Sequence, residues 1–162
     1  MQQLCDVRHC QSYASFYWEL GDGSRTSAID FRIDIGPGAE EIEADPDAVR
    51  QILSNLLENS LRYTPRGGRI TCRSIRVDSG IALSVADTGS GIVPEHLARI
   101  FERFYRSDPA RSREQGGTGL GLAIVKHLVE AHGGRASAES ERGVGTTITC
   151  WFPDDIPTPR LV

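Results

Sequence analysis

Hydrophobic side chains recur along this chain with two different periods, and each period predicts one kind of secondary structure. From Ala28 to Ile35, apolar and polar residues alternate, which is typical of a strand with one buried face. Asp45 as a cap and Pro46 at the first helical position predict a helix start. The apolar stripe of this helix consists of Val49, Ile52, Leu53, Leu56, Leu57 and Leu61.

The same patterns predict the remaining elements. Asp78-Ser79-Gly80 is so short a connection that its flanking strands should form a hairpin. The polar stretch 107–117 has the composition of a mobile loop, and the Pro-rich tail 154–162 that of a flexible end. Helices are predicted at 6–20, Pro94–Tyr105 (with Leu97, Ile100, Phe101 and Phe104 buried) and Leu120–Ala131, and strands at Arg69–Val77, Ile81–Ala86, Arg135–Ser140 and Thr146–Phe152.

Hairpin-linked strands with helices gathered between them predict an α+β fold. We expect a two-layer sandwich in which helices cover one face of a mixed, mostly antiparallel sheet. A chain of 162 residues is the size of one domain, here assigned to residues 1–153. We find no internal repeat and no second domain.

Composition narrows the classes of partner. The net charge of −4 argues against a nucleic-acid surface, which needs clustered positive charge. No apolar run has the length of a membrane span and the start lacks a signal peptide, so we expect a cytoplasmic protein without membrane contact. Cys5, Cys10, Cys72 and Cys150 lack metal-ligand spacing and are interpreted as reduced, apolar side chains.

Asn55 and Asn59 are the first candidates for chemistry. They stand four residues apart on the predicted helix and therefore project from one face. Two amide oxygens on one face suit a hard cation such as Mg²⁺ that bridges phosphates. The structural alternative is that two poor helix formers occupy surface positions by accident.

Asp87 closes an apolar strand and is followed by Gly89 and Gly91. A carboxylate at this point can accept a hydrogen bond from an exocyclic amine, which would select adenine over guanine. The two glycines would let the backbone lie close to a base. The structural alternative is an Asx turn that ends the strand.

Gly117, Gly119 and Gly121 precede the third predicted helix. The free amides at a helix start form a phosphate site. The run is not a Walker loop, because Leu122 stands where that motif requires Lys, and its spacing does not match a dinucleotide fingerprint. Four arginines flank the preceding loop, either as solvated charges or as phosphate contacts: Arg103, Arg106, Arg111 and Arg113.

Taken together, these stretches resemble the ATP-binding catalytic domain of sensor histidine kinases. That domain belongs to a superfamily with DNA gyrase, the MutL proteins and the heat-shock chaperone ATPases. The resemblance covers about Ile29 to Phe152. The residues that carry it are similar to an N box (Asn55–Pro65), a first glycine box (Asp87–Gly91), an F box (Phe101–Arg106), a second glycine box (Gly117–Leu122) and a closing glycine segment (Gly143–Thr147).

The resemblance implies a role for each matching residue. Asn59, with Asn55, would hold Mg²⁺, Asp87 would bond the adenine amine, Arg62 would face phosphate and Tyr63 would lie against the nucleotide. The nucleotide contacts that it implies are Asn55, Asn59, Arg62, Tyr63, Asp87, Gly89, Gly91, Gly117, Thr118, Gly119, Leu120, Gly121, Leu122 and Thr146.

One difference from the hydrolysing relatives bears on the reaction. They carry a water-activating Glu where this chain has Asn55, and an amide takes no proton at neutral pH. The resemblance therefore implies transfer of the γ-phosphoryl group to a protein acceptor, with Asn55, Asn59 and Glu58 as the catalytic set.

None of the four histidines, His9, His96, His127 and His132, has the sequence context of a phosphoacceptor. We therefore expect the acceptor on a His-containing dimerisation or phosphotransfer domain, or on a separate split-kinase protein, with a response regulator downstream. Two alternatives stay open. One is an ATP-binding docking module without transfer activity, and the other is a Ser/Thr kinase of the anti-sigma-factor type.

Overall fold

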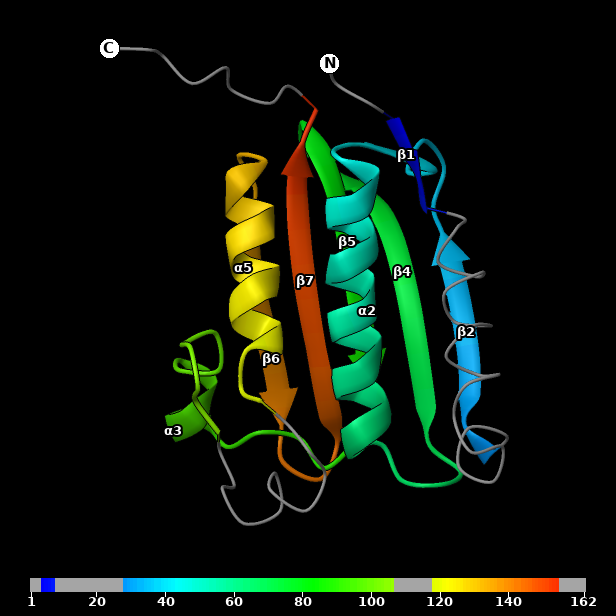
Figure 1. The fold of residues 1–162 in the computed structure, drawn as a ribbon. Helices are drawn as coiled ribbons and strands as arrows, with labels where there is room; N and C mark the ends of the chain where they lie inside the picture. Colours follow the sequence, from blue (N-terminus) through cyan, green and yellow to red (C-terminus); the bar gives the residue numbers. More distant parts are fainter. Residues whose placement is uncertain (1–3, 8–27, 107–117, 155–162) are drawn as a thin grey trace.

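The computed structural model describes residues 4–7, 28–106 and 118–154 (Figure 1). Within these residues, five strands form one sheet in the order β2-β4-β5-β7-β6. Its members are β2 (Asp30–Ile35), β4 (Arg69–Val77), β5 (Gly80–Asp87), β6 (Arg135–Glu141) and β7 (Gly145–Pro153). The β2–β4 pair is parallel and the other three pairs are antiparallel. The predicted mixed, mostly antiparallel sheet is confirmed.

Two helices lie side by side across one face of this sheet, α2 (Pro46–Tyr63) and α5 (Gly121–Ala131) (Figure 1). The cap predicted for α2 is present, because the Asp45 carboxylate accepts the Asp47 N–H at 2.8 Å. The apolar stripe of α2 is buried against the sheet, apart from Leu61, which is half-buried. None of the helices in the described ranges is long and apolar enough to cross a membrane.

A second, smaller sheet was not predicted. It pairs β1 (Leu4–Asp6) with β3 (Glu41–Glu43) in antiparallel register, so Asp6, placed in the predicted helix 6–20, lies in a strand instead. Residues 8–20 of that helix lie outside the described part of the chain. Each strand has only three residues, too few to show a clear period.

The helix predicted over Pro94–Tyr105 is wrong in length. Helix α3 covers only Pro94–Leu97, and turns follow it to Phe104. Phe104 has a left-handed φ of 63°, and its N–H donates to the Gly119 carbonyl at 2.9 Å instead of to its own helix. Phe104 is 71% exposed, so it is not the core residue that the spacing predicted, whereas Phe101 packs against the core.

Candidate functional site

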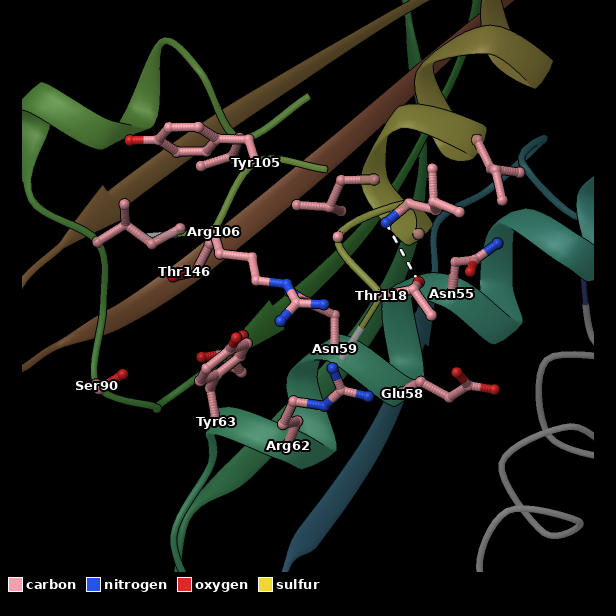
Figure 2. A pocket seen from close by; sticks show the side chains of 18 of the residues that line it. Asn55, Glu58, Asn59, Arg62, Tyr63, Ser90, Tyr105, Arg106, Thr118 and Thr146 are labelled. Carbon is pink, nitrogen blue, oxygen red and sulfur yellow. Dashed lines mark hydrogen bonds between the residues drawn. The ribbon is translucent and has the colours of Figure 1, made fainter. Parts of the chain in front are cut away.

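A cavity of about 340 Å³ opens between α2, the start of α5 and the loop after β5 (Figure 2). It gathers residues from all five of the motif stretches identified in the sequence, with Thr146 from the closing glycine segment. The predicted site residues that line it are Asn55, Glu58, Asn59, Arg62, Tyr63, Asp87, Gly91, Thr118, Gly119, Leu120, Gly121, Leu122 and Thr146. Gly89 is not among the lining residues, and Gly117 lies outside the described residues.

The amide pair of α2 forms one end of the cavity. The Asn55 Nδ2 donates to the Gln51 carbonyl at 2.9 Å, which turns the Asn55 Oδ1 away from its own helix and towards the start of α5. Asn59 stands one turn later, and both side chains are half-buried. Two half-buried amide oxygens are suitable ligands for a Mg²⁺ ion that retains several waters.

Two arginines contribute positive charge to the cavity wall. Figure 2 shows Arg62 rising from α2 and Arg106 reaching into the cavity from the loop after α3. Neither guanidinium forms an ion pair with an acidic group of the described residues. Unpaired arginines at a cavity wall favour an anionic ligand.

The start of α5 adds a second anion-binding element. Leu120 occupies the cap position without a side-chain cap, and its own N–H donates to the Thr118 hydroxyl at 3.3 Å. Three residues that open this end, Leu120, Gly121 and Leu122, line the cavity. The start of α5, where free backbone amides and the positive end of the helix dipole favour anions, therefore forms part of the cavity wall.

Asp87 lies at the tip of β5, beside Ser60, which follows Asn55 by five residues on α2. Its carboxylate accepts the Gly89 N–H at 2.9 Å and the Ser60 hydroxyl at 3.2 Å. Burial raises the pKa of Asp87 above its ordinary value, and these hydrogen bonds, with one from the Thr146 backbone, oppose the rise. The side chain is an acceptor that retains unused lone pairs at a half-buried position.

The structure shows why glycine is needed at positions 89 and 91, which the sequence alone did not reveal. A Cβ on Gly91, whose φ is 67°, would overlap the Glu141 carbonyl. A Cβ on Gly89 would lie 2.7 Å from both the Asp87 carboxylate and the Tyr63 carbonyl. Gly89 thus permits the Asx-type turn that holds Asp87, which was the structural alternative for this motif.

Sequence reasoning missed several lining residues: Ser90, Ile92, Ile100, Tyr105 and Ile124. Tyr105 is held in place by a hydrogen bond to the His96 ring and by Arg99, whose guanidinium lies 4.4 Å from the centre of the Tyr105 ring. Arg106, left open as a solvated charge or a phosphate contact, lines the cavity. Ser90 lies within the first glycine box, and Tyr105 and Arg106 lie within the F box, so membership of these motifs was the signal available for them.

Comparison with known proteins places these observations in context. The sequence model of the family described as "Histidine kinase-, DNA gyrase B-, and HSP90-like ATPase" matches residues 44–156. Sensor protein IrlS of Burkholderia pseudomallei is 47% identical over 116 residues, which are 72% of this chain and 25% of that protein. Sensor histidine kinase WalK of Bacillus subtilis is 48% identical over 115 residues, 69% of this chain and 19% of that protein. The chain therefore spans a quarter or less of these relatives.

Solved structures match over nearly the whole chain. The mycobacterial sensor histidine kinase MprB is 30% identical with a TM-score of 0.76, covering 94% of this chain and 97% of that one. Full-length ShkA, solved in complex with AMPPNP, is also 30% identical with a TM-score of 0.76, and the match covers 94% of this chain and 31% of that one.

Proposed function

This chain belongs to the family of histidine kinase-, DNA gyrase B- and HSP90-like ATPases, and its relatives are sensor histidine kinases. The family resemblance inferred from the motifs is thereby confirmed. We propose that the chain binds Mg·ATP and transfers the γ-phosphoryl group to a histidine on a partner domain or protein. This would make it the catalytic part of a two-component system.

The observation that carries the proposal is the polarity of the cavity. The acceptor carboxylate of Asp87 lies beside Ser60, whereas the start of α5 lies beside Asn55, five residues earlier on α2. Arg62 and Arg106 add positive charge to the cavity wall. A nucleotide with an amine on its base and a chain of phosphates has the same polarity. The ShkA relative was solved with AMPPNP, a nucleotide of this form, which supports ATP as the ligand here.

We assign the metal to the phosphate end of the cavity. Asn59, with Asn55, would hold Mg²⁺, whose chemistry is to neutralise charge on the phosphates and keep them in register. Asn55 is suited to this because its Nδ2 is engaged with the Gln51 carbonyl, which leaves its Oδ1 as the atom offered to a ligand.

Transfer to a protein is favoured over hydrolysis by the residues near this end. Asn55 has no proton-accepting group for an attacking water. In the proposed reaction an imidazole nitrogen bonds to the γ-phosphorus while the bond to the β,γ-bridging oxygen breaks, and ADP leaves. Glu58 lies at the exposed rim (Figure 2), where its carboxylate can take the proton that the phosphorylated imidazole releases.

The acceptor is proposed to lie on another domain or protein. His96 is hydrogen bonded to Tyr105, and His132 is hydrogen bonded to the Leu128 carbonyl and the Asp45 N–H. A response regulator would receive the phosphoryl group next, and we place these steps in the cytoplasm. The fold neighbour ThkA was solved with its response regulator TrrA, at 24% identity, so that likeness concerns the fold alone.

Incubation with γ-labelled ATP and candidate His-bearing partners tests this function. Acid-labile label on one partner supports histidine phosphorylation, since phosphohistidine is acid-labile. Acid-stable label would indicate a Ser/Thr kinase, and release of labelled phosphate without any partner would indicate hydrolysis. Nucleotide binding without any transfer would indicate a docking module.

A further inference from the structure

Ser140 is a half-buried residue of β6 that does not itself line the cavity. It contacts three residues close to Asp87, the residue to which the base of the nucleotide is assigned: Ile92, Gly145 and Thr146. Its Oγ accepts the Ile92 N–H at 2.8 Å and donates to the Gly145 carbonyl at 2.9 Å. It also lies 2.8 Å from the Thr146 Oγ1. Ile92 and Thr146 both line the cavity, so one hydroxyl joins the loop after β5 to the start of β7 behind the site.

Counting protons fixes the direction of the contact between the two hydroxyls. Ser140 has one proton, and the Gly145 carbonyl can only accept it. If Ser140 gave its proton to Thr146 instead, two oxygen lone pairs would face each other across 2.9 Å at Gly145. The arrangement without this conflict has Thr146 donating to Ser140, whose two lone pairs then accept from Ile92 and Thr146.

This direction determines what Thr146 offers to a ligand. With its only hydroxyl proton directed to Ser140, the Oγ1 of this cavity-lining residue has only lone pairs left for a ligand. Thr146 is also the register partner of Asp87 on the adjacent strand, which places their side chains next to each other. The carboxylate of Asp87 accepts hydrogen bonds as well. This part of the wall therefore consists of two neighbouring acceptors.

We propose that Ser140 is a positioning residue for base specificity. By accepting a hydrogen bond from the Thr146 hydroxyl, it makes the wall at Asp87 and Thr146 favour a 6-amino purine over a 6-oxo purine. An amino group gives hydrogens to this wall, whereas a carbonyl oxygen facing two acceptors is repelled. The inference rests on the proposed function, because it assumes that the base of ATP lies at Asp87.

Removal of the Ser140 hydroxyl has a distinctive consequence. In Ser140→Ala the Thr146 proton loses its acceptor and becomes free to turn towards the cavity, where a 6-oxo group accepts it. The loss of support at Ile92 weakens binding of any purine nucleotide. The ratio of two affinities separates these effects, because a merely structural role changes both affinities by the same factor.

The test compares Mg·ATP with Mg·ITP, which carries a 6-oxo group in place of the 6-amino group. Calorimetry on the whole chain gives both dissociation constants. We expect the wild type to prefer ATP about tenfold or more, and Ser140→Ala to lower this preference about three- to tenfold. Ser140→Thr keeps the hydroxyl and should restore it. Ser137→Ala, an exposed serine of the same strand, should leave it unchanged.

A double-mutant cycle with Thr146→Val excludes a general effect. Since Ser140 acts through the Thr146 hydroxyl, Ser140→Ala should not change the ATP/ITP ratio further in the Thr146→Val background. If Ser140→Ala does not fold, as judged by thermal unfolding, Ser140→Cys preserves size while weakening the acceptor and should lower the ratio in the same direction.

The outcomes separate the two proposals. An unchanged ATP/ITP ratio in the folded Ser140 variants, or a further fall in the Thr146→Val background, overturns the role of Ser140 while leaving ATP binding intact. Failure of the wild type to bind ATP overturns the proposed function itself, and the specificity role with it.

Discussion

The Oδ1 of Asn55 lies 3.1 Å from the point where a Cβ on Gly121 would stand. The middle of α2 therefore lies close to the first residue of α5. It brings an amide oxygen and a set of free helix-start amides to one end of the cavity. The proposed metal and phosphate groups would share this space, so it is sensitive to one added carbon atom.

Gly121→Ala should weaken binding of Mg·ATP by about five- to tenfold while leaving thermal stability near the wild-type value. The added Cβ crowds the Asn55 oxygen, but alanine favours the helix. Calorimetry and thermal unfolding measure the two effects. Gly36→Ala is the matched control, because its Cβ would make only ordinary contacts of 3.5 Å or more. Equal ATP affinity in the two variants would contradict the assignment of this end to phosphates.

Asn59→Ala should abolish the part of ATP affinity that depends on Mg²⁺, and phosphotransfer with it, while some metal-free nucleotide binding remains. Titration of ATP with Mg²⁺ and then with EDTA measures that part. Gln51→Ala changes an exposed residue two turns earlier on the same helix and serves as the control. Retention of the full Mg²⁺ effect in Asn59→Ala would show that the metal is held elsewhere.

Asp87→Asn should separate stability from binding. Burial raises the pKa of Asp87, so the charged form costs the fold stability once the pH rises above that pKa. Protonation restores this stability as the pH falls towards the ordinary value of 3.8. The variant at pH 7 should therefore unfold at a temperature no lower than the wild type. Its ATP affinity should fall about 10- to 150-fold, because the amide places donors where an acceptor is needed.

The pH dependence of wild-type binding has the opposite sign. ATP affinity should decrease as acidification protonates Asp87, and this decrease should begin at a higher pH than for an ordinary Asp. An Asp87→Asn variant that binds ATP as tightly as the wild type, or unfolds at a lower temperature at pH 7, would contradict this account of the carboxylate.

Arg106→Ala should weaken ATP binding by about tenfold and adenosine binding little, because its guanidinium is assigned to the phosphates. Added salt should reduce the difference between variant and wild type. Arg103→Ala, an exposed arginine nearby that does not line the cavity, is the control. Similar losses for adenosine and ATP would place Arg106 against the base instead.

Gly91→Ala should destabilise the domain by about 3 kcal/mol or more, as followed by denaturant unfolding. Both Gly91 and Gly67 have left-handed φ values, but a Cβ on Gly67 meets nothing within 4 Å. Gly67→Ala should therefore cost only the strain of the backbone, about 1–2 kcal/mol. If the two variants were equally stable, the close approach of Gly91 to Glu141 would not matter.

Local patterns predicted most of this fold because the long elements have strong periods. The alternation before Ile35 and the stripe of α2 each match the element found. The parallel pairing of β2 with β4 was beyond such patterns, since no local signal states which strands become neighbours. The pattern placed Phe104 in the helix of α3, but the Phe104 N–H bonds to the Gly119 carbonyl, a contact between distant parts of the sequence that no local period shows.

In the candidate site, too, some residues could be predicted from local sequence and others depend on contacts between distant segments. Motif residues such as Asn55, in the middle of α2, and Asp87, at the end of β5, line the cavity and were predicted from the sequence. Ser140 belongs to none of the motifs, and its proposed role in base specificity follows only from its hydrogen bonds to Ile92 and Thr146. Pairing across strands, and not sequence spacing, positions such residues.

Calorimetric titration of the folded chain with Mg²⁺ and a non-hydrolysable ATP analogue tests the central claim most directly. We predict saturable binding of one nucleotide per chain, lost in Asp87→Ala and weakened when Mg²⁺ is withdrawn. Absence of heat at millimolar nucleotide, or wild-type binding by Asp87→Ala, would contradict the assignment of this cavity to Mg·ATP.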